Sequence, residues 1–279
     1  MNQLKPYTFQ YSQDELKSFL DSVKLMYGYD FTEYAEASVK RRIVNFMTIY
    51  KIPSLHHLSN LLLNDETVFE TFVQELSVTV TEMFRDPTFY KSLRENVIER
   101  LATYPVIKVW IAGCATGEEV YSVAIILKEA GLLEKSIIYA TDINQKSIQI
   151  ARDGLYAVDN MKFYTVNYNK SGGTHSLSAY YISKYNSVLF DKTLRQNIVF
   201  SPHNLTVDKS FNEFQLIICR NVLIYFNQQL QNKVINLFDE SLCSFGFLAL
   251  GSKESLLFTD KKSNYEVVDK KERIFMKIK

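Results

Sequence analysis

The chain has 279 residues, of which 47% are hydrophobic, and its 32 basic and 31 acidic side chains give a formal net charge of +1. This composition is typical of a globular protein with one large or two smaller domains, and a charge so close to zero provides no general field to attract nucleic acid or anionic lipid. The three cysteines, Cys114, Cys219 and Cys243, are far apart and lie in apolar runs, so we expect a reducing cytosol rather than a disulfide framework.

Neither the start of the chain nor its apolar runs indicate membrane targeting. Residues 1–10 contain no basic start followed by an apolar stretch, so no secretory signal is expected. The apolar window at 214–226 is interrupted by Arg220 and Asn221, well short of the roughly 20 residues that a spanning helix needs. We therefore expect a cytoplasmic protein without membrane insertion, and a monomer, because no heptad pattern is present.

The first third of the sequence predicts helices. From Ser12 to about Leu101 the apolar residues recur at helical spacing, which predicts an all-helical N-terminal domain over residues 1–85. Capping patterns support helix starts at three places: Ser12 with Glu15, Asp30 with Glu33, and Asp86 followed by Pro87.

After Pro105 the pattern alternates between short β-rich runs and helical stretches. Such alternation predicts an α/β domain over residues 86–279, with a parallel sheet and helices on both faces. The expected strands are at 107–111, 137–141, 197–201, 214–219, 247–251 and about 273–278, and the expected helices include 118–130 and 228–242. A Tyr-rich segment at about 154–197 lacks a helical period, so we expect an inserted β subdomain there, with a turn at Ser171-Gly172-Gly173.

A glycine-bearing turn follows the first expected strand. Gly113 and Gly117 let the backbone approach a ligand, and the helix N-terminus beyond them points its N–H groups at it. A dinucleotide-binding turn would have three glycines spaced G-x-G-x-x-G, whereas here Glu118 and Glu119 follow the second glycine. Two acids would repel a pyrophosphate but attract an ammonium and a sulfonium, which favours S-adenosylmethionine over NAD.

The second expected strand ends at Asp142, where ligands bind in open α/β sheets. A carboxylate at this place can accept both ribose hydroxyls of an adenosine. It can equally cap the helix that follows, and its position alone leaves both roles open.

Five motifs in order along nearly the whole chain resemble the CheR-type chemotaxis receptor methyltransferases. They are Thr81 to Asp86, similar to T-x-F-F-R-D; Gly113 to Ser122, similar to G-C-S-T-G-E-E-P-Y-S; Thr141-Asp142-Ile143; His203-Asn204-Leu205; and Ile218 to Phe226. The chain departs from the pattern at Met83, Ala115 and Val120, which are packing or helix-start positions. The resemblance implies a Rossmann-like S-adenosylmethionine-dependent methyltransferase domain with a small β-subdomain insertion, preceded by an all-helical domain.

The resemblance also implies roles for individual residues. Arg85 would pair with the methionyl carboxylate, a task suited to a guanidinium fork, and Thr79 and Thr81 would supply hydroxyls near it. Glu118 would hold the amino acid portion and Asp142 the ribose, and Gly113 would bind the cofactor from the turn. The adenosine and methyl-donor sides would be lined by Asn204, Leu205, Arg220 and Asn221. Tyr225 would lie near the transferring methyl group, or would be a core residue with a satisfied hydroxyl.

The implied reaction is methyl transfer to glutamate side chains of chemotaxis receptors, giving methyl esters and S-adenosylhomocysteine. A glutamate is already ionised at neutral pH, so placement and exclusion of water suffice without a general base, and we expect no metal site. The basic run Lys40-Arg41-Arg42 is either a solvated helix face or a contact with the acidic helical cytoplasmic domain of a receptor. Two alternatives stay open: a related methyltransferase acting on another protein or a small acid, and a non-catalytic receptor-binding module.

Overall fold

The computed structural model describes residues 11–76 and 81–279, which group into two compact units. The helical unit contains the described residues up to Leu76 together with Tyr225–Leu230. The second unit contains the described residues from Thr81 to Ile224 and from Gln231 to Lys279. The described helices include none that is both long and apolar enough to span a bilayer.

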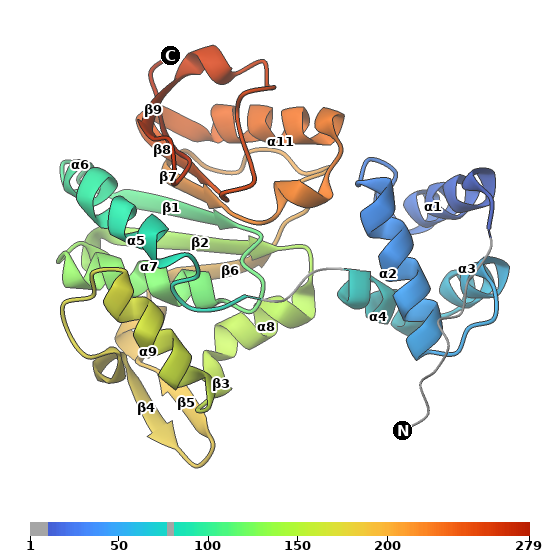
Figure 1. The fold of residues 1–279 in the computed structure, drawn as a ribbon, viewed down its shortest axis with the longest axis horizontal. Coiled ribbons are helices and arrows are strands. Elements are labelled where there is room, and N and C mark those ends of the chain that lie inside the picture. The colour runs from blue at the N-terminus through green and yellow to red at the C-terminus, as the bar shows by residue number, and fades with distance from the viewer. Residues whose placement is uncertain (1–10, 77–80) are drawn as a thin grey trace. The chain divides into compact units, whose positions relative to one another are not determined.

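The helical unit is built from four helices, shown in blue to cyan in Figure 1. They are α1 (Gln13–Tyr27), α2 (Glu36–Ile49), α3 (Leu55–Asn64) and α4 (Glu66–Leu76). The apolar positions at helical spacing, such as Phe46 and Phe72, form one buried cluster. The all-helical prediction is therefore confirmed.

Of the predicted helix starts, that at Ser12 is confirmed in detail, because Ser12 and Glu15 form both bonds of a capping box. The predicted cap at Asp30 is wrong. The Asp30 carboxylate accepts from Thr32 and pairs with Lys24 at 2.7 Å, and α2 begins only at Glu36. Asp86 precedes a helix with Pro at its start, as predicted, but makes no side-chain cap bond because its carboxylate pairs with Arg220.

The second unit contains a seven-stranded sheet of order β6-β2-β1-β7-β8-β10-β9. Its strands are β1 (Ile107–Ala112), β2 (Ser136–Asp142), β6 (Ile198–Pro202), β7 (Phe214–Cys219), β8 (Leu242–Leu250), β9 (Tyr265–Asp269) and β10 (Ile274–Lys277). The first five in this order are parallel, as predicted, whereas β10 pairs antiparallel with both β8 and β9. The sheet is therefore mixed, and its strand β9 was not expected.

Helices cover this sheet on both faces (Figure 1). They are α5 (Pro87–Leu93), which continues through a π-helical turn (Arg94–Ile98) into α6 (Glu99–Leu101), and α7 (Glu118–Glu129), α8 (Gln145–Asp153) and α11 (Gln228–Ser241). Alternate residues of β1 serve opposite faces. Val109 and Ile111 join the cluster that contains the apolar side of α7, whereas Trp110 packs edge-on against Phe238 of α11.

The insertion between α8 and β6 forms a three-stranded antiparallel sheet of order β3-β5-β4. Its strands are β3 (Leu155–Ala157), β4 (Tyr181–Lys184) and β5 (Ser187–Phe190), accompanied by α9 (Asn160–Lys170) and α10 (Lys192–Arg195). The expectation that this segment has no helix is wrong. Met161, Tyr164 and Tyr168 are on the buried face of α9, and they join the main core of the unit, which also includes Val188 and Phe190 of the small sheet.

The boundary between the two units also differs from the predicted one at residue 85. Met83 and Phe84 are fully buried in the core of the second unit, so the segment from Thr81 to Arg85 belongs there. The helical spacing upstream could not show this, because Met83 and Phe84 lie in a turn rather than in a helix.

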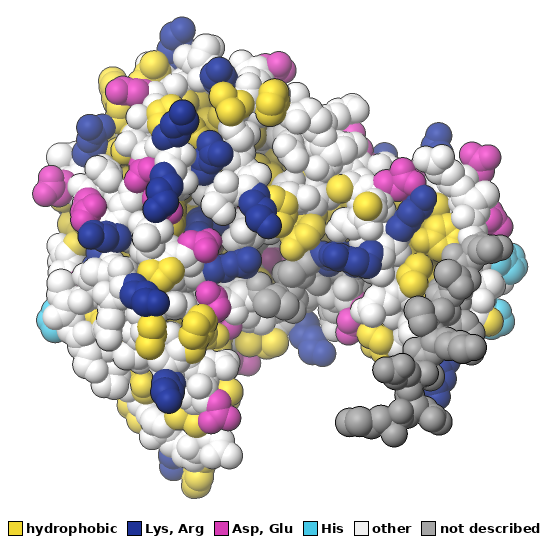
Figure 2. All heavy atoms as spheres, in the orientation of Figure 1, with side chains coloured by type: hydrophobic (Ala, Val, Ile, Leu, Met, Phe, Trp, Pro, Cys, Tyr) yellow, Lys and Arg dark blue, Asp and Glu magenta, His cyan; other side chains and the backbone are white. Residues whose placement is uncertain are grey.

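Figure 2 shows basic and acidic side chains interspersed over the face of the molecule in view. This mixture matches the near-zero net charge.

Candidate functional site

The turn after β1 is held in a conformation that favours glycine at two places. Gly113 has φ +80° and Gly117 has φ +95°, and a Cβ on Gly113 would lie 2.4 Å from Cγ2 of Val222. The N–H groups of Gly113 and Cys114 both donate to the carbonyl of Thr141 at the end of β2. The turn is therefore fixed to the neighbouring strand on one side and packed against the end of β7 on the other.

Asp142 is the last residue of β2, and its carboxylate bonds to the same turn. Oδ2 accepts from the N–H of Ala115 at 2.8 Å, and Oδ1 accepts from the N–H of Asn144 at 2.9 Å. The helix cap of α8 is Asn144, not Asp142. Burial raises the pKa of Asp142, against the effect of its backbone hydrogen bonds. Each oxygen has a further lone pair, so the carboxylate can still accept from two ribose hydroxyls.

Glu118 is the first residue of α7 and is 94% buried, since its relative exposure is 6%. Its carboxylate accepts from the Thr116 hydroxyl at 2.6 Å. Burial raises its pKa from 4.5 to about 7, while the Thr116 bond opposes the shift. Among residues 11–76 and 81–279, no basic side chain forms an ion pair with it. A buried acid without a cation suits a ligand that brings an ammonium.

Arg85 lies between two residues with left-handed backbone, Phe84 at φ +53° and Asp86 at φ +57°. Left-handed backbone is costly for a bulky residue such as Phe84, and strain of this kind persists where surrounding contacts enforce it. Here the N–H of Phe84 donates to Ser122 of α7 at 3.0 Å, and Asn167 of α9 donates to the carbonyl of Met83 at 3.1 Å. Two helices thus hold the turn that presents Arg85.

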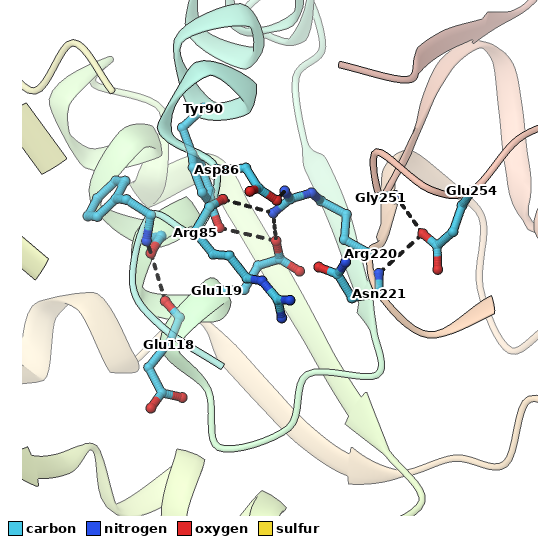
Figure 3. A network of polar contacts seen from close by, with 11 residues as sticks. Arg85, Asp86, Tyr90, Glu118, Glu119, Arg220, Asn221, Gly251 and Glu254 are labelled. Atoms are coloured by element: carbon cyan, nitrogen blue, oxygen red, sulfur yellow. Dashed lines mark hydrogen bonds and ion pairs between the residues drawn. The ribbon is translucent and has the colours of Figure 1, made fainter. Parts of the chain in front are cut away.

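Arg220, directly after β7, holds the same turn from a third side (Figure 3). Its Nη1 lies 2.9 Å from Glu119 and 3.3 Å from the carbonyl of Arg85, and its Nη2 lies 2.8 Å from Asp86. The guanidinium also stacks over the Phe89 ring, 4.0 Å from its centroid. These contacts engage the Arg220 side chain within the protein, which differs from the implied role of lining the cofactor.

Asn204 and Asn221 lie in the segments that follow β6 and β7. Asn221 has φ +62°, and its N–H donates to the carboxylate of Glu254. Asn204 accepts from the N–H and hydroxyl of Thr206 through its side-chain oxygen, and Leu205 beside it is buried. The N–H of His203 donates to the carbonyl of Asp142, so this loop lies next to the end of β2.

The remaining predicted site residues have different surroundings. Thr79 lies outside the described residues, and Thr81 is partly buried just before the Met83 to Asp86 turn. Tyr225 groups with the helical unit, where its carbonyl accepts from the N–H of Ala35 and its ring lies 4.8 Å from the guanidinium carbon of Arg42.

The basic run does not form one exposed surface. Lys40 pairs with Glu36 at 2.5 Å, and Arg41 is exposed. Arg42 is partly buried, and it donates to the carbonyl of Leu76.

Three acids that organise this region did not stand out in the sequence: Asp86, Glu119 and Glu254. The local sequence predicts only a helix cap at Asp86 and a charge near the turn at Glu119, because nothing nearby marks Arg220 as their partner. Glu254 follows Gly251 by three residues after a strand, a spacing at which an acid can reach back to a turn's N–H groups. That spacing was the available signal.

The comparisons with known proteins decide the family. Residues 79–274 match the model of the CheR methyltransferase SAM-binding domain, and residues 14–77 match that of the CheR methyltransferase all-alpha domain. The chain belongs to the CheR methyltransferase family. Its cofactor is S-adenosylmethionine.

Two relatives of this CheR protein match it over most of their own length. It is 46% identical to "Putative methyltransferase Cher3" of Pseudomonas putida over 263 residues, covering 94% of this chain and 96% of that protein. It is 30% identical over 241 residues to a chemotaxis protein methyltransferase of Listeria innocua, covering 86% and 89%. The solved N-methyltransferase NodS of Bradyrhizobium japonicum, in complex with S-adenosylhomocysteine, is 14% identical at a TM-score of 0.35, covering 61% of this chain and 62% of that one.

The geometry of this CheR site fits the cofactor. Glu118 is a buried acid at a helix N-terminus without a cation, Gly113 is partly exposed in the turn that precedes this helix, and Asp142 keeps acceptor capacity at the end of β2. These residues come together because they lie at the ends of neighbouring strands, namely β1, β2, β6 and β7. The strands end at the same edge of the sheet, as the pairing of Ala112 with Thr141 and of Asp142 with Pro202 shows.

Proposed function

We propose that this protein transfers the methyl group of S-adenosylmethionine to glutamate side-chain carboxylates of chemotaxis receptors, in the cytoplasm and as a monomer. The observation that carries the proposal is that relatives named chemotaxis protein methyltransferases match along 86% to 96% of this chain, across both of its units. The name of those relatives implies receptors as acceptors, and a shared fold alone would not.

In this proposal each residue of the site binds or orients. Glu118 would hold the amino group of the methionyl portion, Arg85 its carboxylate with Thr79 and Thr81 nearby, and Asp142 the ribose hydroxyls. Gly113 allows close approach of the backbone, and Asn204, Leu205 and Asn221 would line the adenosine side. Bound S-adenosylmethionine supplies an electrophilic methyl group on a sulfonium.

The acceptor needs little activation. A glutamate carboxylate is ionised at neutral pH, so the protein's task is to orient it and to exclude water. We assign Tyr225 to the region of the acceptor, and Arg220 to holding the turn that bears Arg85 rather than to contact with cofactor.

We also assign the helical unit to the receptor. The substrate carboxylates make the receptor surface acidic, and Arg41 is the exposed member of the basic run. Lys40 and Arg42 would add positive charge, although Lys40 pairs with Glu36 and Arg42 donates to the carbonyl of Leu76.

The test is methyl transfer from radiolabelled S-adenosylmethionine to receptor-rich membranes. Carboxyl methyl esters release methanol in mild base, so base-labile label on the receptor supports the proposal. Base-stable label, or label on other proteins alone, would show a different acceptor. An Asp142→Ala protein serves as the control for cofactor-dependent transfer.

A further inference from the structure

Glu254 is a buried acid that belongs to none of the motifs above. It follows β8, is 4% exposed, and its carboxylate accepts four backbone hydrogen bonds. Oε1 accepts from the N–H of Val222 and of Leu223, both at 2.8 Å. Oε2 accepts from Gly251 at 2.5 Å and from Asn221 at 3.2 Å. Figure 3 shows this carboxylate between the segment of Gly251 and that of Asn221.

These four bonds join the ends of two neighbouring strands. Asn221, Val222 and Leu223 lie directly beyond β7, and Gly251 lies directly beyond β8. Three successive N–H groups that point at one carboxylate form an anion-binding nest, here filled by the protein's own side chain. The carboxylate holds Asn221 in its left-handed conformation at φ +62°.

The loop that Glu254 holds is packed against the turn after β1. Cγ2 of Val222 fills the space beside Gly113, where an added Cβ would lie only 2.4 Å from it. A displacement of the Asn221 to Leu223 loop would therefore move both Asn221 and the wall against which the Gly113 turn rests. One side chain, that of Glu254, accepts from all three N–H groups of this loop.

We infer that Glu254 is a positioning residue for the cofactor site, acting through the Asn221 to Leu223 loop on Asn221 and on the Gly113 turn. This inference rests on the cofactor roles proposed above for Gly113 and Asn221. It assigns to Glu254 no contact with cofactor or acceptor.

The test compares S-adenosylhomocysteine affinity, by calorimetry, between the full-length protein and Glu254→Gln. The amide keeps one acceptor oxygen and turns its NH2 group toward N–H donors, so the loop should shift and the affinity should fall about ten-fold or more. Glu254→Asp keeps the charge on a shorter side chain, so its affinity should lie between that of the unchanged protein and that of Glu254→Gln. Glu266→Gln on the exposed face of β9 should bind as the unchanged protein does.

Two further measurements separate positioning from a loss of stability. Leu256→Ala removes a buried side chain two residues from Glu254 but none of the atoms in the four bonds of its carboxylate, so it should lower the unfolding midpoint while keeping the affinity. Emission of Trp110, the single tryptophan and fully buried, reports whether the sheet is intact. Amide resonances of Asn221, Val222, Leu223 and Gly251 should move in Glu254→Gln.

The outcomes distinguish this inference from the proposed function. A folded Glu254→Gln protein that binds as tightly as the unchanged one would overturn the inference, while receptor methylation would still stand. If Glu254→Gln does not fold, Glu254→Asp decides: weaker binding with native Trp110 emission supports positioning, and unchanged binding overturns it. Failure of the unchanged protein to methylate receptor, with Glu254→Gln still weaker in binding, would remove only the proposed acceptor.

Discussion

Arg220 and Glu119 form a buried ion pair, with 2.9 Å between Nη1 and the carboxylate oxygen and side-chain exposures of 3% and 13%. The same oxygen of Glu119 accepts from the hydroxyl of Tyr90 at 3.1 Å. The second partner of Arg220, Asp86, has a side chain that is 45% exposed. Arg220 thus joins the end of β7 to α7 through Glu119 and to the turn before α5 through Asp86. Glu119 is buried, whereas Asp86 is in contact with water.

Removing Arg220 should cost far more stability than removing Asp86. Arg220→Met leaves Glu119 buried without a cation, for which about 3–5 kcal/mol of unfolding free energy is expected, whereas Asp86→Asn should cost about 1 kcal/mol or less. Urea unfolding of both variants measures the difference. Equal losses would mean that Asp86, not Glu119, is the principal partner.

Asp142→Ala should weaken S-adenosylhomocysteine binding about ten-fold or more, because charged hydrogen bonds contribute roughly 1.5–3 kcal/mol. Calorimetry measures the affinity, and Asp159→Ala, an exposed acid in the same unit, is the matched control. The Ala115 and Asn144 N–H groups lose their acceptor in this variant, so Trp110 emission must first show a native fold. Unchanged binding in a folded variant would refute the ribose role.

Arg85→Lys should not behave as a conservative change. An ammonium is a point charge and cannot reproduce a guanidinium fork on a carboxylate, so we expect a raised KM for S-adenosylmethionine. The measurement is the initial rate of methyl transfer at limiting and at saturating cofactor, with Arg152→Lys on the exposed side of α8 as the control. Full activity of Arg85→Lys at limiting cofactor would exclude the assigned contact.

Cofactor binding should depend on pH through Glu118. With a pKa of about 7 in the free protein, this carboxyl is mostly protonated at pH 6 and ionised at pH 8. Because an ammonium binds the ionised form, the affinity for S-adenosylhomocysteine should rise about ten-fold from pH 6 to pH 8. Glu118→Gln should bind weakly with little change over this range. A pH dependence that survives in Glu118→Gln would assign it to another group.

The same group should influence folding stability with the opposite sense. Its pKa is raised on folding from 4.5 to about 7, so between these values the folded state binds more protons than the unfolded one. Its contribution is therefore fully present below pH 4.5 and is lost as the pH rises through 7. Between pH 5 and pH 8 the unfolding free energy should fall more in the unchanged protein than in Glu118→Gln. An equal fall in both proteins would contradict the raised pKa of Glu118.

Separate substitutions in the basic run should have separate effects. Arg41→Glu should slow methylation of receptor and leave S-adenosylhomocysteine affinity unchanged, because Arg41 is exposed on the helical unit. Arg42→Glu should instead lower stability, since Arg42 is partly buried and bonds to the carbonyl of Leu76. Receptor methylation and thermal unfolding of each variant give the two readouts. Equal losses of methylation and cofactor binding in Arg41→Glu would point to misfolding.

The sequence predicts well what depends on local pattern. The β-rich run at 107–111 and the helix at 118–130 match β1 and α7, because burial on both faces of a parallel strand leaves a continuous apolar run and Gly117 marks the helix start. The α9 helix was missed although Met161, Tyr164 and Tyr168 are at helical spacing. The tyrosines of this segment, Tyr164 and Tyr168 among them, suggested strands instead, because aromatic residues are enriched in strands.

Long-range pairing was beyond local patterns. The glycine-bearing turn and Asp142 could be placed from strand ends, but the partners of Arg220 lie 101 and 134 residues away in sequence. The same holds for Glu254, whose bonds to Val222 and Leu223 span 32 and 31 residues. A side chain's availability to a ligand depends on such partners, and the motif that contains Arg220 could not show that the fold pairs it with Glu119 and Asp86.

The place of β10 in the sheet has a consequence for synthesis of the chain. Residues Ile274–Lys277 lie between β8 and β9, so this interior strand follows both of its neighbours in the sequence. While the chain is still on the ribosome, β8 has an open edge and β9 has no partner in the sheet, and open edges promote association between chains. Completion of this sheet must therefore wait until residues Ile274–Lys277 have been synthesised and have left the ribosome. A chain shortened before Ile274 should accumulate as aggregates rather than as a slightly weakened enzyme.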